Sequence, residues 1–246
     1  MILLLGNLLL FLVALAAAPR LGWLWQALFP GISRPVWDSQ SWFALLAEHL
    51  MLALGATLIA ALIGLSAAIL ATRPAGRALR PLLDSMFSLA QAVPPIAAIA
   101  LALPLMGFGA APTLLALVLY AALPVMRSAV AGLDAVPAAV LDAARGTGMG
   151  PGRILAQIEL PLALPVIQAG LRVALVLAIA TTAVGAVAGA RCLGTPIVTG
   201  LANGNLSWVL QGAVFTAWLA VIADQALRLG LDPERRRSNG RLAPAR

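Results

Sequence analysis

The residues that most often carry chemistry are few and scattered along this chain. It has one histidine, His49, and one cysteine, Cys192, so an intrachain disulfide is excluded. Neither residue belongs to a cluster with metal-ligand spacing, and the sequence contains no glycine-rich phosphate loop of the Walker type. We therefore interpret both as structural, and we expect no catalytic residue, no metal site and no ATPase activity in the chain itself.

The composition indicates what kind of scaffold holds these residues. Of 246 residues, 62% are hydrophobic and only 10% are charged, against about 25% charged residues in soluble domains. The apolar runs are continuous, as in membrane-spanning helices of about 20 residues, and do not alternate as barrel strands do. We predict an all-α integral membrane protein with one membrane domain.

Six apolar runs are long enough to span a bilayer, and the arginines orient them. The predicted spans are 2–18, 46–71, 84–106, 112–132, 162–189 and 208–228. All 16 basic residues are arginine, and they occupy short loops rather than an aromatic-rich patch, which argues against nucleic-acid binding. Loop 72–83, segment 127–161 and the tail hold most of them, whereas only Arg20, Arg34 and Arg191 fall on the opposite side. The positive-inside rule then places both termini in the cytoplasm.

In the N-terminal region 1–44, the first apolar run and the tryptophan-rich segment that follows it each allow two interpretations. The first apolar run resembles a signal peptide at Ala14, Ala16 and Ala18, but no basic residue precedes it, so we expect a retained span. The following external segment 19–44 contains four tryptophans, which are Trp23, Trp25, Trp37 and Trp42. We interpret them as an aromatic belt at the membrane surface; a docking surface for a soluble partner is the alternative.

The longest cytoplasmic loop, 133–161, has the pattern of two short helices. Pro137 suits a first helical turn, and good helix formers follow it. A group of glycines (Gly146, Gly148 and Gly150) ends that helix and permits a tight turn. Pro151 opens a second short helix, which we expect Pro161 to end. Such a stiff unit can transmit a push, although a surface hairpin without a partner fits the same pattern.

This loop resembles the EAA loop of binding-protein-dependent ABC importer permeases. The matching residues are Asp142-Ala143-Ala144, Gly148, Ile158, Leu160 and Pro161, with aspartate in place of the usual glutamate. The resemblance implies a type I (MetI-like) permease fold and a coupling helix that docks on a separate ATPase subunit, which uses ATP and magnesium. It also makes Arg145, Arg153 and Glu159 candidate contacts with that subunit, with a solvated face as the alternative for each.

Further matches over about residues 45–228 are similar to permeases of glycine betaine, choline and related osmoprotectant importers. They include Gln91, Pro94 and Pro95, Gly107-Phe108-Gly109, Pro112, Arg127, Gly170 and Arg172, whereas Arg191 and Cys192 depart from the pattern. The resemblance implies a permease subunit in a bacterial inner membrane. Its implied partners are ABC ATPase subunits, a second permease copy or a related permease, an external solute-binding protein and membrane lipid.

Two features inside the spans suggest a gate or a solute pathway. Pro94 and Pro95 should break the third span beside Gln91, and irregular backbone at membrane depth must face protein or water. Arg172 falls inside the fifth span, where an arginine either pairs with a neighbouring carboxylate or extends to the membrane surface. We take these four residues as gate or pathway candidates; a simple packing kink is the alternative for the prolines.

The domain division and the rival functions follow from the same features. We divide the chain into a span and external segment at 1–44, a permease domain at 45–228 and an arginine-rich tail at 229–246. A permease for another small solute, such as an amino acid, is one alternative. An ion-driven secondary transporter is another, but it predicts acidic residues in the membrane core and visible repeats, and we find neither pattern.

Overall fold

The computed structural model describes residues 2–230, and among these residues the regular secondary structure is helical, without strands. Five helices are long and apolar enough to cross a membrane: α1 (Ile2–Ala17), α3 (Trp42–Thr72), α6 (Ala110–Asp134), α9 (Leu160–Thr182) and α11 (Leu206–Gly230). The predicted all-α membrane fold is therefore confirmed. Most of the predicted tail at 229–246 lies outside the described residues.

The third predicted span is a broken pair of helices. α4 (Arg80–Ala92) and α5 (Pro95–Met106) meet at an angle of 92°. The 13 residues of α4 are about 20 Å long, short of a hydrocarbon core of about 30 Å. The break predicted from Pro94 and Pro95 is confirmed, but the expectation of a span over 84–106 holds only if the bent pair counts as one crossing.

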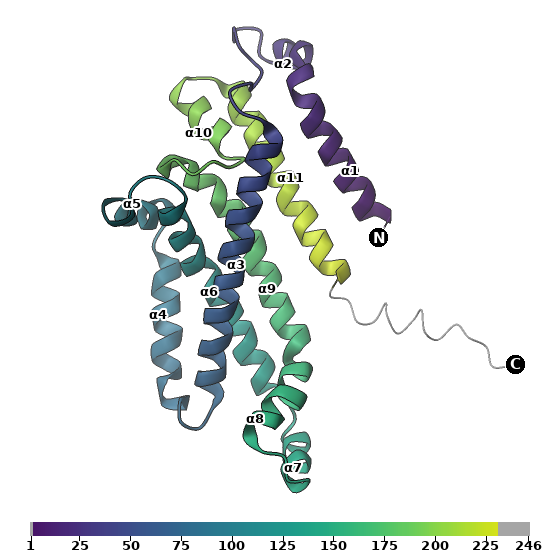
Figure 1. Cartoon of the computed structure of the whole chain (residues 1–246), viewed down its shortest axis with the longest axis vertical. Coiled ribbons are helices and arrows are strands. Elements are labelled where there is room, and N and C mark those ends of the chain that lie inside the picture. Colours follow the sequence, from purple (N-terminus) through teal and green to yellow (C-terminus); the bar gives the residue numbers. More distant parts are fainter. Residues whose placement is uncertain (1, 231–246) are drawn as a thin grey trace, which may run out of the picture.

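Short elements join the long ones at both ends of the molecule. Toward one end lie η1 (Ala18–Arg20), α2 (Gly22–Leu28), η4 (Ala183–Ala188) and α10 (Thr195–Ala202). Toward the other lie η2 (Arg77–Leu79), α7 (Ala138–Gly146), α8 (Pro151–Ile154) and the π-helical turn Leu155–Glu159. The arginine-rich loops thus share one end with α7 and α8 (Figure 1).

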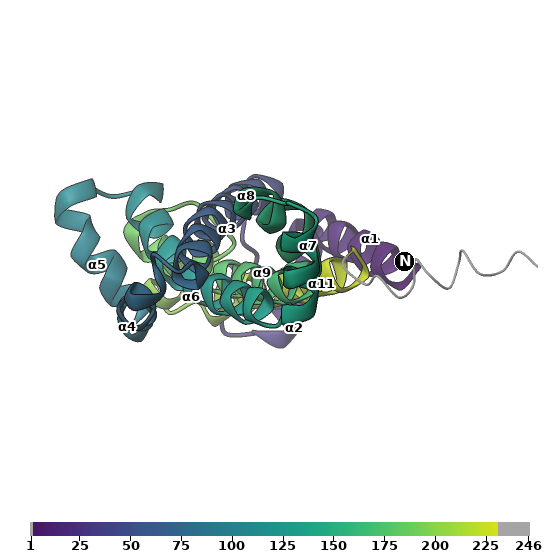
Figure 2. The ribbon, with the colours of Figure 1, turned by 90° about the horizontal axis from the view of Figure 1, so that it is seen from below.

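The long helices form a flat bundle around α6. The helices α3 and α9 flank α6, α4 and α5 form one edge, and α1 with α11 form the opposite edge (Figures 1 and 2). A stripe of small buried residues on α3 faces α6: Ala53, Ala56, Ala60, Gly64, Ala68 and Ala71. A Cβ atom added at Gly64 would lie 2.8 Å from the Ala122 carbonyl oxygen, so these two helix backbones nearly touch.

The N-terminal region packs into the bundle. Phe11 of α1 makes edge-on contacts with Phe215 and Trp218 of α11. Asn7 donates a hydrogen bond to Gln225 and accepts one from the indole of Trp218. The helix α1 therefore contributes apolar and polar contacts to the core.

The external tryptophans divide into two groups. Trp37 and Trp42 are each only 2% exposed, and they pack edge-on against Trp208 and Phe215. The aromatic-belt interpretation is wrong for these two, because both side chains are buried against α11. Trp23 on α2 is 71% exposed, as a residue at a membrane surface would be.

Candidate functional site

The loop 133–161 forms an elbow at the arginine-rich end of the molecule. The helix α7 ends at Gly146, and Gly148 adopts a left-handed conformation with φ of +80°. The Met149 amide donates to the Ala144 carbonyl at 3.2 Å, and the Gly148 amide donates to the Arg145 carbonyl at 2.9 Å. This pair of bonds is a Schellman motif, which closes the end of a helix where glycine supplies the left-handed residue. The predicted glycine turn is therefore present.

The second half of the elbow differs from the prediction. The expectation that Pro161 ends a separate short helix is wrong, because α8 continues through the π-helical turn into α9. A proline ring clashes with the carbonyl of the residue four positions earlier. For Pro161 that residue is Gln157, which lies inside the π-helical turn Leu155–Glu159, where the wider helix shifts the carbonyl. The elbow is thus continuous with a spanning helix.

Buried contacts anchor the elbow to the bundle. Ala144 is 7% exposed and Ile154 is 6% exposed. Leu160 packs against the apolar cluster where α3, α6 and α9 meet, and Ile158 is half-buried. Glu159 is buried and lies 2.8 Å from Arg73, at the end of α3. Neither alternative predicted for Glu159 is found: its carboxylate is buried in this ion pair, so it is neither solvated nor open to another subunit.

The outer face of the elbow is polar and open. Asp142 and Arg145 are both exposed and form an ion pair at 2.7 Å, one turn apart on α7. Ala143 is exposed beside them, and Gly148 has open space around its α-carbon. Arg153 donates to Gln157 on the exposed side of α8 and the π-helical turn. The residues predicted for coupling thus lie in one elbow, and Pro161 stands in the first turn of α9.

The four gate candidates do not lie together. Gln91, Pro94 and Pro95 stand at the break between α4 and α5. Arg172 of α9 instead forms an ion pair with Asp224 of α11, and Asp224 also binds Arg228. This ion pair joins α9 to α11, and α11 lies at the edge of the bundle opposite to α4 and α5 (Figure 2). Of the two alternatives for Arg172, pairing with a neighbouring carboxylate is the one observed.

Reciprocal hydrogen bonds hold the break against α6. The Gln91 side chain donates to the Tyr120 carbonyl at 3.2 Å. In an unbroken helix that carbonyl would accept from residue 124, but Pro124 has no N–H. The Tyr120 hydroxyl in turn donates to the Val93 carbonyl at the break itself. Each side chain therefore satisfies a backbone oxygen that a proline or a helix end has left free.

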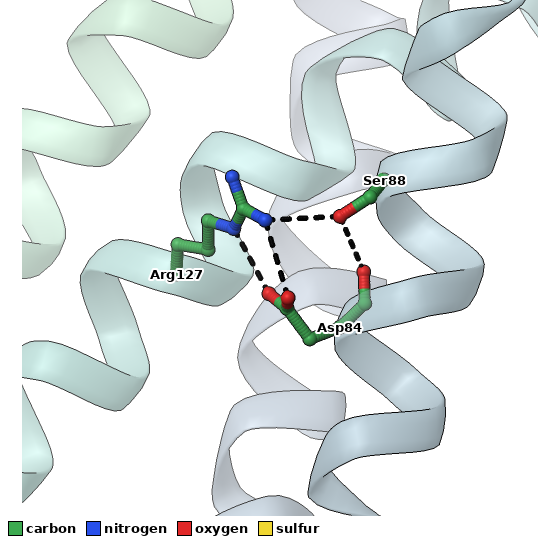
Figure 3. Close-up of polar contacts among 3 residues, drawn as sticks. All are labelled: Asp84, Ser88 and Arg127. Carbon is green, nitrogen blue, oxygen red and sulfur yellow. Dashed lines mark hydrogen bonds and ion pairs between the residues drawn. The ribbon is translucent and has the colours of Figure 1, made fainter.

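Charged contacts continue this line toward the arginine-rich end of the molecule. Arg127 of α6 donates to both carboxylate oxygens of Asp84, at 2.9 and 3.2 Å, and to the Ser88 hydroxyl at 2.9 Å (Figure 3). Arg80 and Asp134 form a further pair at 2.7 Å. A cavity of about 450 Å³ opens beside these groups, and Pro81, Met126 and Val130 supply apolar walls. We call the whole line of contacts, from Arg80–Asp134 to Tyr120–Val93, the α4/α6 seam.

The α4/α6 seam was not predicted from the sequence, although the sequence contains a signal for it. Asp84, Ser88 and Gln91 follow one another at intervals of four and three residues, which places them on one helix face. Tyr120, Arg127 and Asp134 recur every seven residues, and this spacing also selects one face. Two matching polar faces on neighbouring apolar helices predict a contact.

His49 and Cys192 satisfy buried backbone groups. The His49 ring lies 3.0 Å from the Ile179 carbonyl through Nε2 and accepts the Leu193 amide at Nδ1. The Cys192 thiol donates to the Thr182 carbonyl. Both contacts are made where α9 gives way to η4, so each side chain serves backbone packing. No group of three metal-ligating side chains is found within residues 2–230.

Comparison with known proteins identifies the family of this chain. Residues 60–229 match the family described as "Binding-protein-dependent transport system inner membrane component". The chain belongs to this family and is a multi-pass inner-membrane permease subunit of an ABC transporter, of the kind that works with separate ATPase subunits.

Individual relatives place the chain within the family. It is 36% identical to the osmoprotectant import permease protein OsmY of Salmonella typhimurium, over 73% of this chain and 76% of that protein. It is 39% identical to the glycine betaine/carnitine/choline transport system permease protein OpuCD of Bacillus subtilis, over 72% of this chain and 77% of that one. The choline transport system permease protein OpuBD of Bacillus subtilis is 37% identical, over 78% of this chain and 86% of that protein.

Solved structures agree on the fold. An inward-facing form of the MetNI methionine ABC transporter matches with a TM-score of 0.67 at 21% identity, covering 75% of this chain and 91% of that one. An amino acid ABC transporter matches with a TM-score of 0.61 at 19% identity, covering 79% of this chain and 92% of that one. The predicted MetI-like permease fold is therefore confirmed.

Proposed function

We propose that this permease imports a small osmoprotectant with a quaternary ammonium group, such as glycine betaine or choline. The solutes of the related permeases support this solute class, since glycine betaine, carnitine and choline share a trimethylammonium group. An external binding protein selects the solute, and two permease subunits, identical or related, enclose the path. ATP and magnesium act in the partner ATPase.

The observation that carries the coupling part of this proposal is the geometry of the elbow. The helix α7 presents Asp142, Ala143 and Arg145 outward, while Leu160 and the Arg73–Glu159 ion pair anchor the elbow to the bundle. Its second arm continues into α9, and the hydrogen-bonded turn at Gly148 joins α7 to that arm, so a push on α7 reaches a spanning helix. The exposed face of α7 docks on the ATPase subunit.

The same proposal orients the chain. The end that carries the elbow also carries Arg73, Arg77 and Arg80, and the positive-inside rule makes it cytoplasmic. The first residues of α1 and the last of α11 face toward that end (Figure 1). Both termini are then cytoplasmic, with six crossings if α4 and α5 count as one.

A pair of glycine substitutions tests the coupling role. Gly148→Ala forces a side chain into a left-handed conformation, which costs about 1–2 kcal/mol and distorts the turn. Gly146→Ala, two residues away in the helix, meets no atom within 4 Å and keeps an ordinary conformation. We expect Gly148→Ala to lose the co-purifying ATPase and solute uptake, and Gly146→Ala to keep both. Equal ATPase retention by the two variants would contradict docking through this turn.

A further inference from the structure

The break between α4 and α5 leaves backbone oxygens without their helical donors. In an α-helix the carbonyl of one residue accepts from the N–H four residues later. For Ala90 and Gln91 those residues are Pro94 and Pro95, which have no N–H. The two side-chain hydrogen bonds at the break go to other oxygens, those of Tyr120 and Val93.

This break is exposed at membrane depth. Ala92 and Pro94 are exposed, and so are the large side chains of Val93 and Ile96. The break lies about 20 Å from the start of α4 at Arg80, within an apolar core about 30 Å thick. Free carbonyls at that depth cannot face lipid, so they face a water-filled path or another protein surface.

The electrostatics of the break favour a cation. The carbonyls at the end of α4 carry the negative end of its helix dipole. The formal charges one to two turns away, Asp84 and Arg127, neutralise each other. Tyr120 is the only tyrosine in the chain, and its hydrogen bond to Val93 holds it at this point. Aromatic rings attract quaternary ammonium groups.

We propose that the α4–α5 break, through the carbonyls of Ala90 and Gln91 beside Tyr120, binds the quaternary ammonium group of the solute during its passage. This proposal rests on the proposed function and adds a contact inside the permease to selection by the binding protein. Dipoles without a formal negative charge bind a cation weakly, and weak binding lets the solute leave again.

Thiol labelling in the assembled transporter tests the site independently of uptake. The exposed Ala92 is replaced by cysteine and treated with two methanethiosulfonates, one carrying a trimethylammonium group and one neutral. Native Cys192 is 0% exposed, and burial raises the pKa of its thiol, so it gives little background. The quantity measured is the labelling rate of the cationic reagent divided by that of the neutral reagent. We expect this ratio to fall about fivefold when Pro94→Ala and Pro95→Ala together restore the backbone N–H donors to the Ala90 and Gln91 carbonyls.

Pro104→Ala is the matched control, because it removes a proline of α5 away from the break and should leave the ratio unchanged. Choline should slow labelling of the Ala92→Cys variant by the cationic reagent. If the double proline variant does not assemble, this competition measurement tests the proposal by itself. A thiol at position 92 that reacts with neither reagent, an unchanged rate ratio, or no effect of choline overturns the proposal. Uptake in the same vesicles separates the proposed solute class from the proposed cation site. If the unmodified protein imports no trimethylammonium solute but the preference for the cationic reagent remains, the solute class is refuted and the cation site is retained.

Discussion

The two sides of α6 are built in different ways. Toward α3 and α9 the contacts are small apolar residues and glycines, and an added Cβ at Gly170 would lie 2.5 Å from the Ser128 side chain. Toward α4 the contacts are the ion pairs and hydrogen bonds of the α4/α6 seam, and the Asp84 and Arg127 side chains are 46% and 54% exposed. One side is closely packed, and the other is polar and partly open to solvent.

This difference indicates which part of the permease can move. Close backbone packing has few alternative arrangements, because any shift creates a clash or a void. Half-exposed polar contacts can exchange partners with water at little net cost. We therefore expect α3, α6 and α9 to move as one body with the elbow, and the α4–α5 edge to shift against them during transport.

The largest expected effect comes from enlarging a glycine on the packed side. Gly64→Leu must displace the backbone of α6 at Ala122 and Met126, so we expect a loss of at least about 3 kcal/mol and little folded protein. Gly55→Leu, on the same helix, meets no atom within 4 Å and should be tolerated. Thermal stability by size-exclusion chromatography in detergent distinguishes them. Similar melting temperatures for the two variants would show that α3 and α6 are not in backbone contact.

A smaller loss should follow when one hydrogen bond of the seam is removed. Gln91→Leu leaves the Tyr120 carbonyl without a donor, which costs about 1–3 kcal/mol. Pro124→Ala gives that carbonyl its own helical donor, so the double variant should regain most of the lost stability. The melting temperatures of the unmodified protein, the two single variants and the double variant give the coupling between positions 91 and 124. An additive loss would mean that Gln91 does not act through the Tyr120 carbonyl.

The packed side was easier to predict than the seam. Apolar runs and helix breakers located α1, α3, α6 and α11 to within four residues at each end, because hydropathy and backbone chemistry are local. The predicted span 162–189 overruns α9, which ends at Thr182, because η4 replaces the α-helix from Ala183 to Ala188. The glycine turn at Gly148 followed from the same local rules. The π-helical turn before Pro161 was not predicted, because a proline at that position was expected to end the helix.

Tertiary contacts account for the remaining differences. Trp37 and Trp42 looked like surface residues because tryptophan is common at membrane interfaces, but packing against α11 buries them. Glu159 stood in an exposed-looking loop, and its partner Arg73 lies 86 residues earlier in the chain. Arg172 and Asp224 are 52 residues apart. No local pattern encodes such pairs.

The charged centre of the seam should contribute little to stability and more to transport. Arg127→Gln removes its contacts with Asp84 and Ser88, but these groups are about half exposed, so we expect a loss of about 0.2–1 kcal/mol. Solute uptake should fall further than this loss explains, because α4 loses a contact with the body that moves it. Arg127→Asp combined with Asp84→Arg should restore part of the uptake. A stability loss as large as that of Gly64→Leu would remove the distinction between the two sides of α6.

The smallest effect is expected at the end of the seam nearest the arginine-rich loops. The Arg80 and Asp134 side chains are 43% and 44% exposed, so Arg80→Gln should change the free energy of unfolding by about 0.5 kcal/mol or less. Because solvent reaches this pair, raising the salt concentration from about 0.05 to 0.5 M should abolish the difference from the unmodified protein. Melting temperatures at the two salt concentrations measure it. A larger loss that persists in high salt would show that the pair is buried in the assembled transporter and that the seam is closed there by another subunit.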